Sequence, residues 1–210
     1  FRRVLFRSPN PVEMASCPST RYVGDASSCD GPRYVLYVGR LSRIKRIELL
    51  LRSFAIVHDV MADTVLIVAG PDSEGIECGL RRNTERLGVT DAVVFLGMQS
   101  RSQLRDLYCH AHVAALVSQR ENFGMAAAEA MAHGVPVVLT RHVGVASEAA
   151  DAGAAVVVDD GPDAIAKGIL GVLRDHPRAC RMSRNARAFV ENHYAPRRVA
   201  EMMLSVYKWV

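Results

Sequence analysis

The sequence lacks any long apolar run, although half of its residues are hydrophobic. No stretch approaches the ~20 consecutive apolar residues that a transmembrane helix needs. The first eight residues carry three arginines and have neither a continuous apolar stretch nor a small-residue cleavage site, so they do not resemble a signal peptide. These absences argue against a membrane-spanning segment and against a secretory signal.

Cysteine is scarce and irregularly placed. The five cysteines are odd in number and are never spaced as Cys-x-x-Cys; they are Cys17, Cys29, Cys78, Cys109 and Cys180. This pattern argues against a disulfide framework and against a zinc site. We therefore expect a protein of the reducing cytoplasm.

The excess of positive charge is small outside the first residues. The formal net charge is +4, but three of the basic residues lie in the first eight positions, and the remainder holds 23 basic against 22 acidic residues. A nucleic-acid partner therefore has little support, and none is expected.

The first 32 residues differ in character from the rest of the chain. Residues 1–8 lack an initiator methionine and resemble a translated sequencing adapter, which favours a non-native leader on a fragment whose N-terminal part is missing. A native basic strand leading into the domain is the alternative. Residues 9–32 contain four prolines and show no helical or strand period, so we predict an irregular lead-in.

Beyond residue 32, short apolar runs that often end at glycine alternate with segments of helical periodicity. The runs predict buried parallel strands at residues 34–38, 65–69, 93–96, 112–117, 135–139 and 154–158. The periodic segments predict helices at residues 44–57, 76–87, 102–109 with Ser102 as N-cap, 124–133, 162–175, 178–191 and 196–208. This alternation, without hairpin signals, predicts an α/β fold with a doubly wound parallel sheet of the Rossmann-like type.

The segment after the fourth predicted strand has the composition of an anion site. Gly124 is expected to open a helix, whose first N–H groups have no intrahelical partner and face the rim where ligands bind in such sheets. With the helix dipole, these groups suit a diphosphate. Glu121 and Glu129 flank the cradle, where their carboxylates suit sugar hydroxyls. Either glutamate alone is more readily a solvated surface residue, but the two together indicate a site.

The same segment resembles a known family. Glu121 and Glu129, spaced as Glu-x7-Glu and followed by residues 130–138, resemble the signature of retaining glycosyltransferase family 4, the group 1 glycosyltransferases, which have the two-domain GT-B fold. The likeness runs from about residue 33 to the C-terminus and includes residues 38–41 with Lys45, 49–54, 93–97 and 144–148. Two positions depart from the family pattern. Arg46 stands where a glycine commonly follows the lysine, and Val143 stands where a double glycine is frequent.

The resemblance implies a role for each residue of the site. Glu121 would contact the hydroxyls of the transferred sugar, while Arg40 and Lys45 would bind the diphosphate and stabilise its charge as it leaves. These three are the predicted catalytic residues, and Glu129 would accept hydrogen bonds from the ribose. The remaining donor-binding positions would act through their backbone on sugar, phosphate or base; they are Gly39, Gly97, Met98, Asn122, Phe123, Gly124 and Met125.

No metal or other cofactor is expected. The sequence contains no Asp-x-Asp pair to hold a metal ion. Two cations beside the departing diphosphate can supply the electrostatic stabilisation that Mg²⁺ gives elsewhere.

The resemblance also implies the organisation of the enzyme. Residues 33–194 would form the nucleotide-sugar-binding domain, which is the C-terminal half of a GT-B fold. Residues 195–210 would form a helix that crosses to the missing N-terminal domain, where a glycan or lipid-linked acceptor would bind. The whole enzyme would be cytoplasmic, peripheral at the inner face of the membrane, and would retain the configuration of the sugar. The present chain alone is expected to bind nucleotide sugar weakly and to transfer nothing.

Other functions stay open at this point. A glycosidase with Glu121 and Glu129 as its carboxylate pair would have no use for a phosphate cradle. A sugar-nucleotide epimerase of the same two-domain fold would bind the same donor. A non-catalytic module would bind a nucleotide sugar without transferring it.

The histidines are scattered over predicted loops and element ends. None of His110, His112, His133, His142 and His193 is assigned to catalysis. His133, which precedes Gly134, is predicted to lie at a helix C-terminus, where its charge would interact favourably with the dipole.

Overall fold

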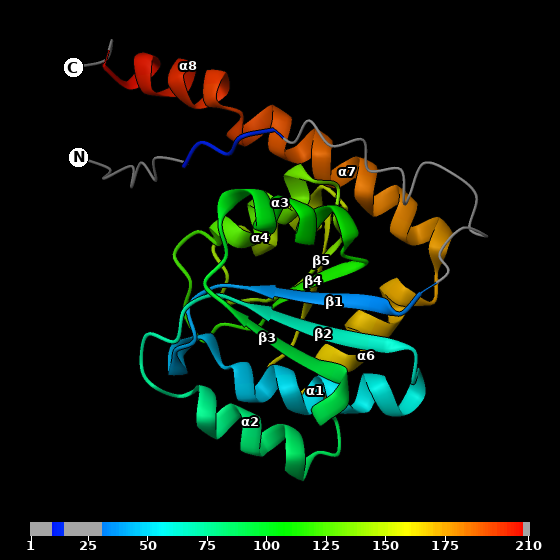
Figure 1. Ribbon diagram of the computed structural model, residues 1–210. Coiled ribbons are helices and arrows are strands. Elements are labelled where there is room, and N and C mark those ends of the chain that lie inside the picture. Colours follow the sequence, from blue (N-terminus) through cyan, green and yellow to red (C-terminus); the bar gives the residue numbers. More distant parts are fainter. Residues whose placement is uncertain (1–9, 15–30, 208–210) are drawn as a thin grey trace.

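The computed structural model describes residues 10–14 and 31–207, and its centre is a six-stranded parallel sheet (Figure 1). The strands pair in the order β3-β2-β1-β4-β5-β6. Their bounds are Arg33–Val38 (β1), Thr64–Ala69 (β2), Val93–Gly97 (β3), Val113–Leu116 (β4), Val137–Thr140 (β5) and Ala155–Val158 (β6). The predicted doubly wound parallel sheet is confirmed.

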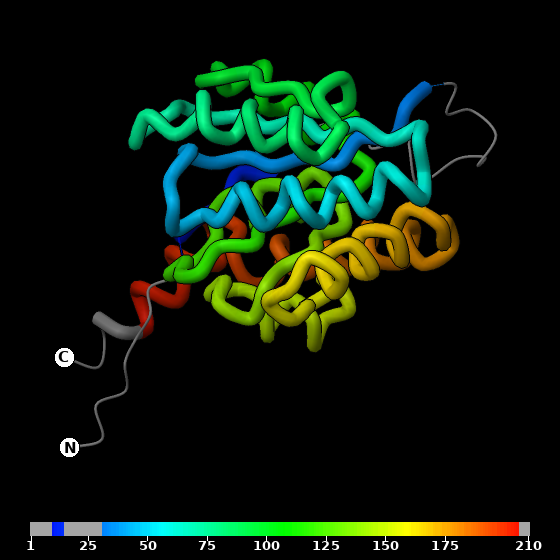
Figure 2. Tube along the Cα trace, turned by 90° about the horizontal axis from the view of Figure 1, so that it is seen from below, coloured from blue at the N-terminus to red at the C-terminus, as the bar shows by residue number. Residues whose placement is uncertain are grey.

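Helices cover both faces of this sheet. Helices α1, α2 and α6 lie on one side, and α3, α4 and α7 lie on the other (Figure 1). Figure 2, seen from below, shows α1 and α6 side by side in front of the strands, where they pack against each other. The bounds are Ile47–Val60 (α1), Glu77–Arg86 (α2), Arg101–His110 (α3), Met125–Ala132 (α4), Ala146–Asp151 (α5), Pro162–Leu173 (α6), His176–Tyr194 (α7) and Pro196–Tyr207 (α8).

Burial on both faces explains why the central strands are continuous apolar runs instead of alternating ones. Every residue of β4 and of β5 is buried. Along β1 the side chains alternate between two cores: Val35 and Tyr37 join the core under α1 and α6, whereas Leu36 joins the core under α4 and α7. Parallel sheets covered by helices are expected to have this pattern.

Three local predictions need correction. The N-cap of α3 is Ser100 and not Ser102, because the Ser100 side chain accepts from the N–H of Gln103 while the Gln103 side chain accepts from the N–H of Ser100. The first helix begins at Ile47, after a 3₁₀ turn over Arg43–Lys45. Helix α5 was not predicted, since its single turn and a half is too short to show a period.

The first described segment, residues 10–14, lies against the end of α7. The N–H of Val12 donates to the carbonyl of Tyr194 (2.8 Å), and Val12 is buried. Helix α8 continues beyond α7, away from the sheet (Figure 1). The predicted leader at residues 1–8 and most of the lead-in lie outside the described residues, so the domain boundaries stay predictions. Over residues 10–14 and 31–207, no helix combines the length and the apolarity that a membrane crossing needs.

The strand order places the candidate site. The chain moves outward from β1 to β2 and β3 on one side and from β4 to β5 and β6 on the other. Strands β1 and β4 are neighbours, so their following loops leave the sheet in opposite directions and open a crevice between them. The first loop carries Arg40 and Lys45, and the second carries Glu121 and Gly124.

Candidate functional site

The turns after β1, β2 and β3 form one layer along the carboxyl rim of the sheet. The N–H of Gly39 donates to Ala69, and the N–H of Gly70 donates to Gly97 (2.9 and 2.8 Å). A Cβ on Gly70 would lie 2.0 Å from the carbonyl oxygen of Gly39, so only glycine allows this approach. Gly39 and Gly97 therefore lie in the layer, and Met98 projects from it with 80% of its surface exposed. The predicted base-binding positions form an open edge.

A buried tyrosine holds the loop after β1 by a hydrogen bond to its backbone. Tyr37 is 1% exposed, and its hydroxyl donates to the carbonyl oxygen of Arg40 (3.0 Å). Burial raises the pKa of Tyr37 well above its ordinary value, and the negative charge of Glu121 raises it further. The Tyr37 hydroxyl therefore stays protonated and acts as a donor. It holds the Arg40 backbone in place, while the Arg40 side chain is exposed at the rim.

Lys45 and Glu121 meet across the crevice. The ammonium Nζ of Lys45 is in direct contact with Oε2 of Glu121, and both side chains are about four-fifths buried, at 18% and 20% exposure. Lys45 ends the 3₁₀ turn before α1, and Glu121 lies in the loop before α4. Two predicted catalytic residues, 76 positions apart, are thus brought together.

The loop that carries Glu121 is held by the loop after β5. The N–H of Glu121 donates to His142 (3.1 Å), the N–H of Gly144 donates to Glu121 (2.9 Å), and the N–H of Val145 donates to Phe123 (2.9 Å). A Cβ on Gly144 would lie 2.0 Å from the carbonyl oxygen of Asn122. Gly144 therefore lets the two loops approach, which explains its place in the residues that resemble the family.

Helix α4 begins without a side-chain cap. Its N-cap is Gly124, with φ 100° and ψ 54°, a left-handed conformation that favours glycine. A Cβ at this position would also lie 2.6 Å from Cγ1 of Val143. Met125 follows as the first helical residue. Because Gly124 has no side chain to cap the helix, the first N–H groups of α4 remain suited to an anion at the crevice.

Glu129 is oriented by a buried tyrosine that sequence reasoning missed. The hydroxyl of Tyr108 in α3 donates to Oε2 of Glu129 (3.0 Å). Burial raises the pKa of Tyr108 well above its ordinary value, and the charge of Glu129 and this hydrogen bond raise it further. One carboxylate oxygen of Glu129 is therefore engaged by Tyr108. A buried tyrosine generally needs a polar partner, but the sequence does not identify that partner.

The side chain of Phe123 packs against the hydrophobic core. Its ring packs edge-on against Tyr194 at the end of α7, with 5.0 Å between centroids and an interplanar angle of 88°. The hydroxyl of Tyr194 in turn donates to Oε2 of Glu148 in α5 (2.7 Å). The neighbouring Asn122 is exposed. The Phe123 side chain is therefore partly engaged in the core, and the donor-binding role of its backbone stays a prediction.

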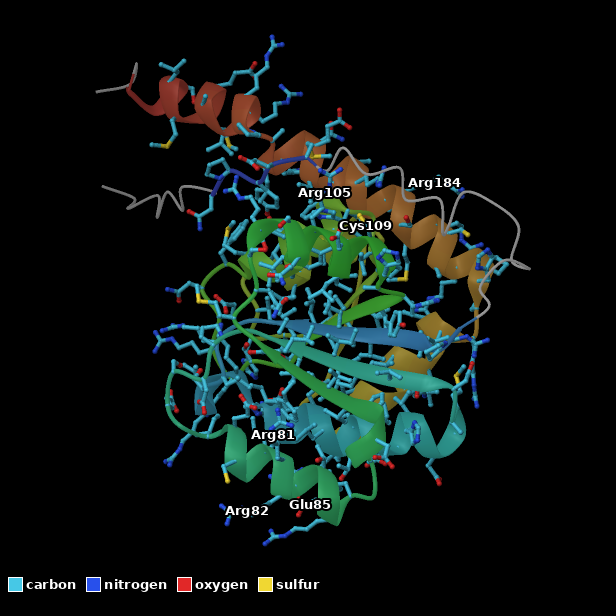
Figure 3. All side chains as sticks on the ribbon, viewed as in Figure 1. Arg81, Arg82, Glu85, Arg105, Cys109 and Arg184 are labelled. Carbon is cyan, nitrogen blue, oxygen red and sulfur yellow. The ribbon has the colours of Figure 1, made fainter. Side chains whose placement is uncertain are left out.

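The predicted charge on His133 is wrong. His133 caps the end of α4, and its ring N–H donates to the carbonyl of Glu129 (2.8 Å), but burial lowers its pKa below 6.5. The positive charges of Arg105, seen on α3 in Figure 3, and of Arg187 lower it further, against the raising effect of the hydrogen bond. At neutral pH the ring is uncharged, and it stacks on Tyr108 at 5.0 Å.

This pKa shift predicts a pH-dependent stability. Because the folded pKa of His133 lies below the unfolded one, its contribution is complete above pH ~6.5 and is lost as the pH falls through the folded value. The free energy of unfolding should decrease between pH 7 and 5 by less in His133→Gln than in the wild type. Urea unfolding at each pH measures this, with the exposed His110→Gln as control. Equal slopes in wild type and His133→Gln would contradict the assignment.

A cavity of about 570 Å³ lies outside this site, between the first turns of α1 and α2. Its lining includes Arg43, Arg52 and Arg82, and it includes none of the predicted site residues. Within the described ranges, no group of three or more His, Cys, Asp or Glu side chains could hold a metal ion.

Comparison with known proteins gives a family match over most of the chain. The family described as Glycosyl transferases group 1 matches residues 24–189. A relative from Corynebacterium urealyticum, named D-inositol 3-phosphate glycosyltransferase, is 34% identical over 180 residues, which are 82% of this chain and 39% of the relative. The chain thus spans well under half the length of this relative.

Solved structures share the fold. HepE from Anabaena in complex with UDP-glucose superposes with a TM-score of 0.77 at 22% identity, covering 85% of this chain and 49% of that one. The C-terminal domain of a group 1 glycosyl transferase, LpcC from Francisella tularensis, gives a TM-score of 0.73 at 18% identity, covering 90% of this chain and 97% of that domain. The fold is therefore that of the C-terminal half of a GT-B enzyme. With the family match over most of its length, the chain belongs to the group 1 glycosyl transferases.

Proposed function

We propose that this chain is the donor-binding half of an enzyme that transfers a sugar from a nucleoside-diphosphate sugar to an acceptor with retention of configuration. The observation that carries the proposal is the contact between Lys45 and Glu121 beside the uncapped first turn of α4. This arrangement joins a cation, a carboxylate suited to sugar hydroxyls and the uncapped helix N-terminus at the crevice between β1 and β4. A diphosphate attached to a sugar needs all three.

Ligand binding would exchange the contacts of the free site. Lys45, with Arg40, would turn to the diphosphate, and Glu121 would accept hydrogen bonds from the sugar hydroxyls in place of Lys45. Glu129 would use its remaining oxygen for the ribose. The cations and the first turn of α4 would stabilise the negative charge that develops as the diphosphate leaves. We propose this stabilisation without a metal ion or another cofactor.

Transfer would occur on one face of the sugar. The bond from the anomeric carbon to the diphosphate oxygen breaks, and the acceptor oxygen forms the new bond on the same face. The acceptor proton passes to the departing phosphate oxygen. Lys45 and Arg40 favour this step because they lower the energy of the leaving diphosphate.

The acceptor half is proposed to be a further domain that α8 reaches. Helix α8 leaves the body of the domain after Tyr194, and Met202 and Leu204 are exposed on it. The acceptor is proposed to be a glycan or a lipid-linked molecule, and the enzyme to be cytoplasmic and peripheral at the inner membrane face. A sugar-nucleotide epimerase of the same fold would share the donor site. Transfer of labelled sugar to an acceptor by the full-length protein would separate these activities.

The role of Glu129 provides the test of donor binding. Glu129→Gln keeps an oxygen for the Tyr108 hydroxyl but removes the charge that favours ribose hydroxyls. The affinity for UDP or GDP, whichever binds more tightly, should fall by about tenfold in isothermal calorimetry. The matched control is Glu85→Gln, because Glu85 projects from α2 away from the sheet (Figure 3). Failure of the wild type to bind either nucleotide, or equal affinities of wild type and Glu129→Gln, would refute the proposed site.

A further inference from the structure

One residue beside the site has an unfavourable backbone conformation. Arg46 has φ 55° and ψ 41°, and it is the single non-glycine residue with positive φ in the described part of the chain. Side chains with a Cβ rarely adopt this conformation, and it is the position where the family commonly has glycine. Arg46 connects the 3₁₀ turn that ends at Lys45 to the start of α1. An arginine here therefore needs a compensating contact.

The side chain of Arg46 makes that contact with a distant loop. Its guanidinium Nη1 lies 2.8 Å from Oδ2 of Asp160, and the side chains are 26% and 34% exposed. Asp160 follows β6, whereas Arg46 follows β1. Strands β4 and β5 lie between these two strands in the sheet, so the ion pair bridges their ends. Arginine can reach across this span, and glycine cannot.

The same carboxylate also holds the loop after β5. Nε2 of His142 lies 3.1 Å from Oδ2 of Asp160. The carbonyl of His142 accepts the N–H of Glu121, and Glu121 contacts Lys45, the neighbour of Arg46. Asp160 therefore connects both segments that carry the Lys45–Glu121 pair.

We propose that Asp160 is a positioning residue, which acts through Arg46 and His142 to hold Lys45 and Glu121 where a diphosphate sugar binds. This inference rests on the proposed function. It assigns Asp160 no contact with the ligand. Loss of its charge would leave the strained Arg46 turn without its anchor and would let Lys45 shift away from the phosphate position.

The electrostatics of the cluster agree with this role. Partial burial acts to raise the pKa of the Asp160 carboxyl, but the hydrogen bond and charge of Arg46 outweigh it, with a further contribution from His142. The net result is a pKa below the ordinary value. Asp160 is therefore ionised at neutral pH, as the ion pair requires.

The test is Asp160→Asn in the present chain, with Asp159→Asn as the matched control. Asp159 is the preceding residue and pairs with Arg141 at the surface, where the side chains are 74% and 64% exposed. Calorimetry would compare a nucleoside diphosphate, UDP or GDP, with the corresponding monophosphate. Asp160→Asn should weaken diphosphate binding by about three- to tenfold, while monophosphate binding and all affinities of Asp159→Asn stay unchanged.

Two further variants exclude a purely structural role. Arg46→Gly relieves the backbone conformation, so it should retain the wild-type melting temperature or exceed it while it loses the same part of the diphosphate affinity. A nucleoside diphosphate has no transferred sugar for Glu121 to contact, so the effect of Asp160 on its binding passes through Lys45. In a Lys45→Met background, Asp160→Asn should therefore weaken diphosphate binding no further.

Each outcome decides between the two proposals. If the wild type binds diphosphate and Asp160→Asn and Arg46→Gly bind it equally well, the positioning role is wrong and the donor site stands. If Asp160→Asn weakens monophosphate and diphosphate binding alike, its role is general and the inference also fails. If the wild type binds neither UDP nor GDP, the proposed function fails, and the inference fails with it.

Discussion

Gly144→Ala should destabilise the domain by ~3 kcal/mol and abolish measurable donor binding. The added Cβ would lie 2.0 Å from the carbonyl oxygen of Asn122, 2.7 Å from its carbonyl carbon and 3.1 Å from Cα of Phe123. These are backbone atoms, so no side-chain rotation relieves the overlap. The loops of Glu121 and Val143 must separate instead, which breaks the hydrogen bonds that both loops share.

The control for this change is Gly79→Ala. Gly79 lies inside α2, and an added Cβ there has no atom within 4 Å outside the helix. Alanine should stabilise the helix at this position by up to ~1 kcal/mol. Urea unfolding of both variants measures the change in the free energy of unfolding. Calorimetry with nucleotide on each variant that is folded measures the change in affinity. A Gly144→Ala protein with wild-type stability and affinity would show that the loops do not approach as described.

Lys45→Met should weaken the binding of a nucleoside diphosphate by about 10- to 100-fold, since contacts between a charged group and its partner contribute ~1.5–3 kcal/mol. Methionine keeps the length of the apolar stem and removes the ammonium. The variant loses the attraction for the diphosphate, and Glu121 loses its partner in the free state. Affinity of the wild type should also fall as salt is added, and this salt dependence should decrease in the variant.

Lys167 provides the matched control. It is an exposed lysine in α6, so Lys167→Met changes the net charge equally at a distance from the crevice. Calorimetry on the two variants separates a local contact from a general charge effect. Equal affinities of Lys45→Met and Lys167→Met for the diphosphate would remove Lys45 from the site.

The strands were predictable because their burial leaves a strong pattern. Strands β4 and β5 are buried on both faces and must be apolar throughout, whereas the connecting turns carry glycine. Helix α5 was not predictable in this way, because its buried residues Ala146 and Ala149 span only one turn. The N-cap of α3 could have been found, since Ser100 and Gln103 have the spacing of a capping box and Ser102 has no such partner three residues on.

The site was predictable only as a set of residue types. Glu121, Gly124 and Glu129 are near in sequence, so their shared location follows from one loop and one helix. The contact of Lys45 with Glu121 follows from β1 and β4 being neighbours, which the strand order shows and the sequence alone does not. The hydrogen bond from Tyr108 to Glu129 likewise depends on how α3 packs beside α4.

The departure of Arg46 from the family pattern can be interpreted only with the structure. From the sequence, the arginine in place of glycine puts the geometry of the phosphate-binding turn in doubt. In the fold, the same side chain forms an ion pair with Asp160 across the ends of two strands. The sequence does not show the backbone conformation of Arg46. It also does not identify the partner of this side chain, because Asp160 lies 114 positions further along the chain.

The most direct test of the central claim is an amide chemical-shift map of the chain during titration with UDP and GDP. If the nucleotide diphosphate binds at the crevice between β1 and β4, the largest shifts should come from Gly39, Gly97 and Gly124. Shifts that gather instead at Gly75 and Gly79, which line the cavity between α1 and α2, would place the ligand elsewhere and contradict the account.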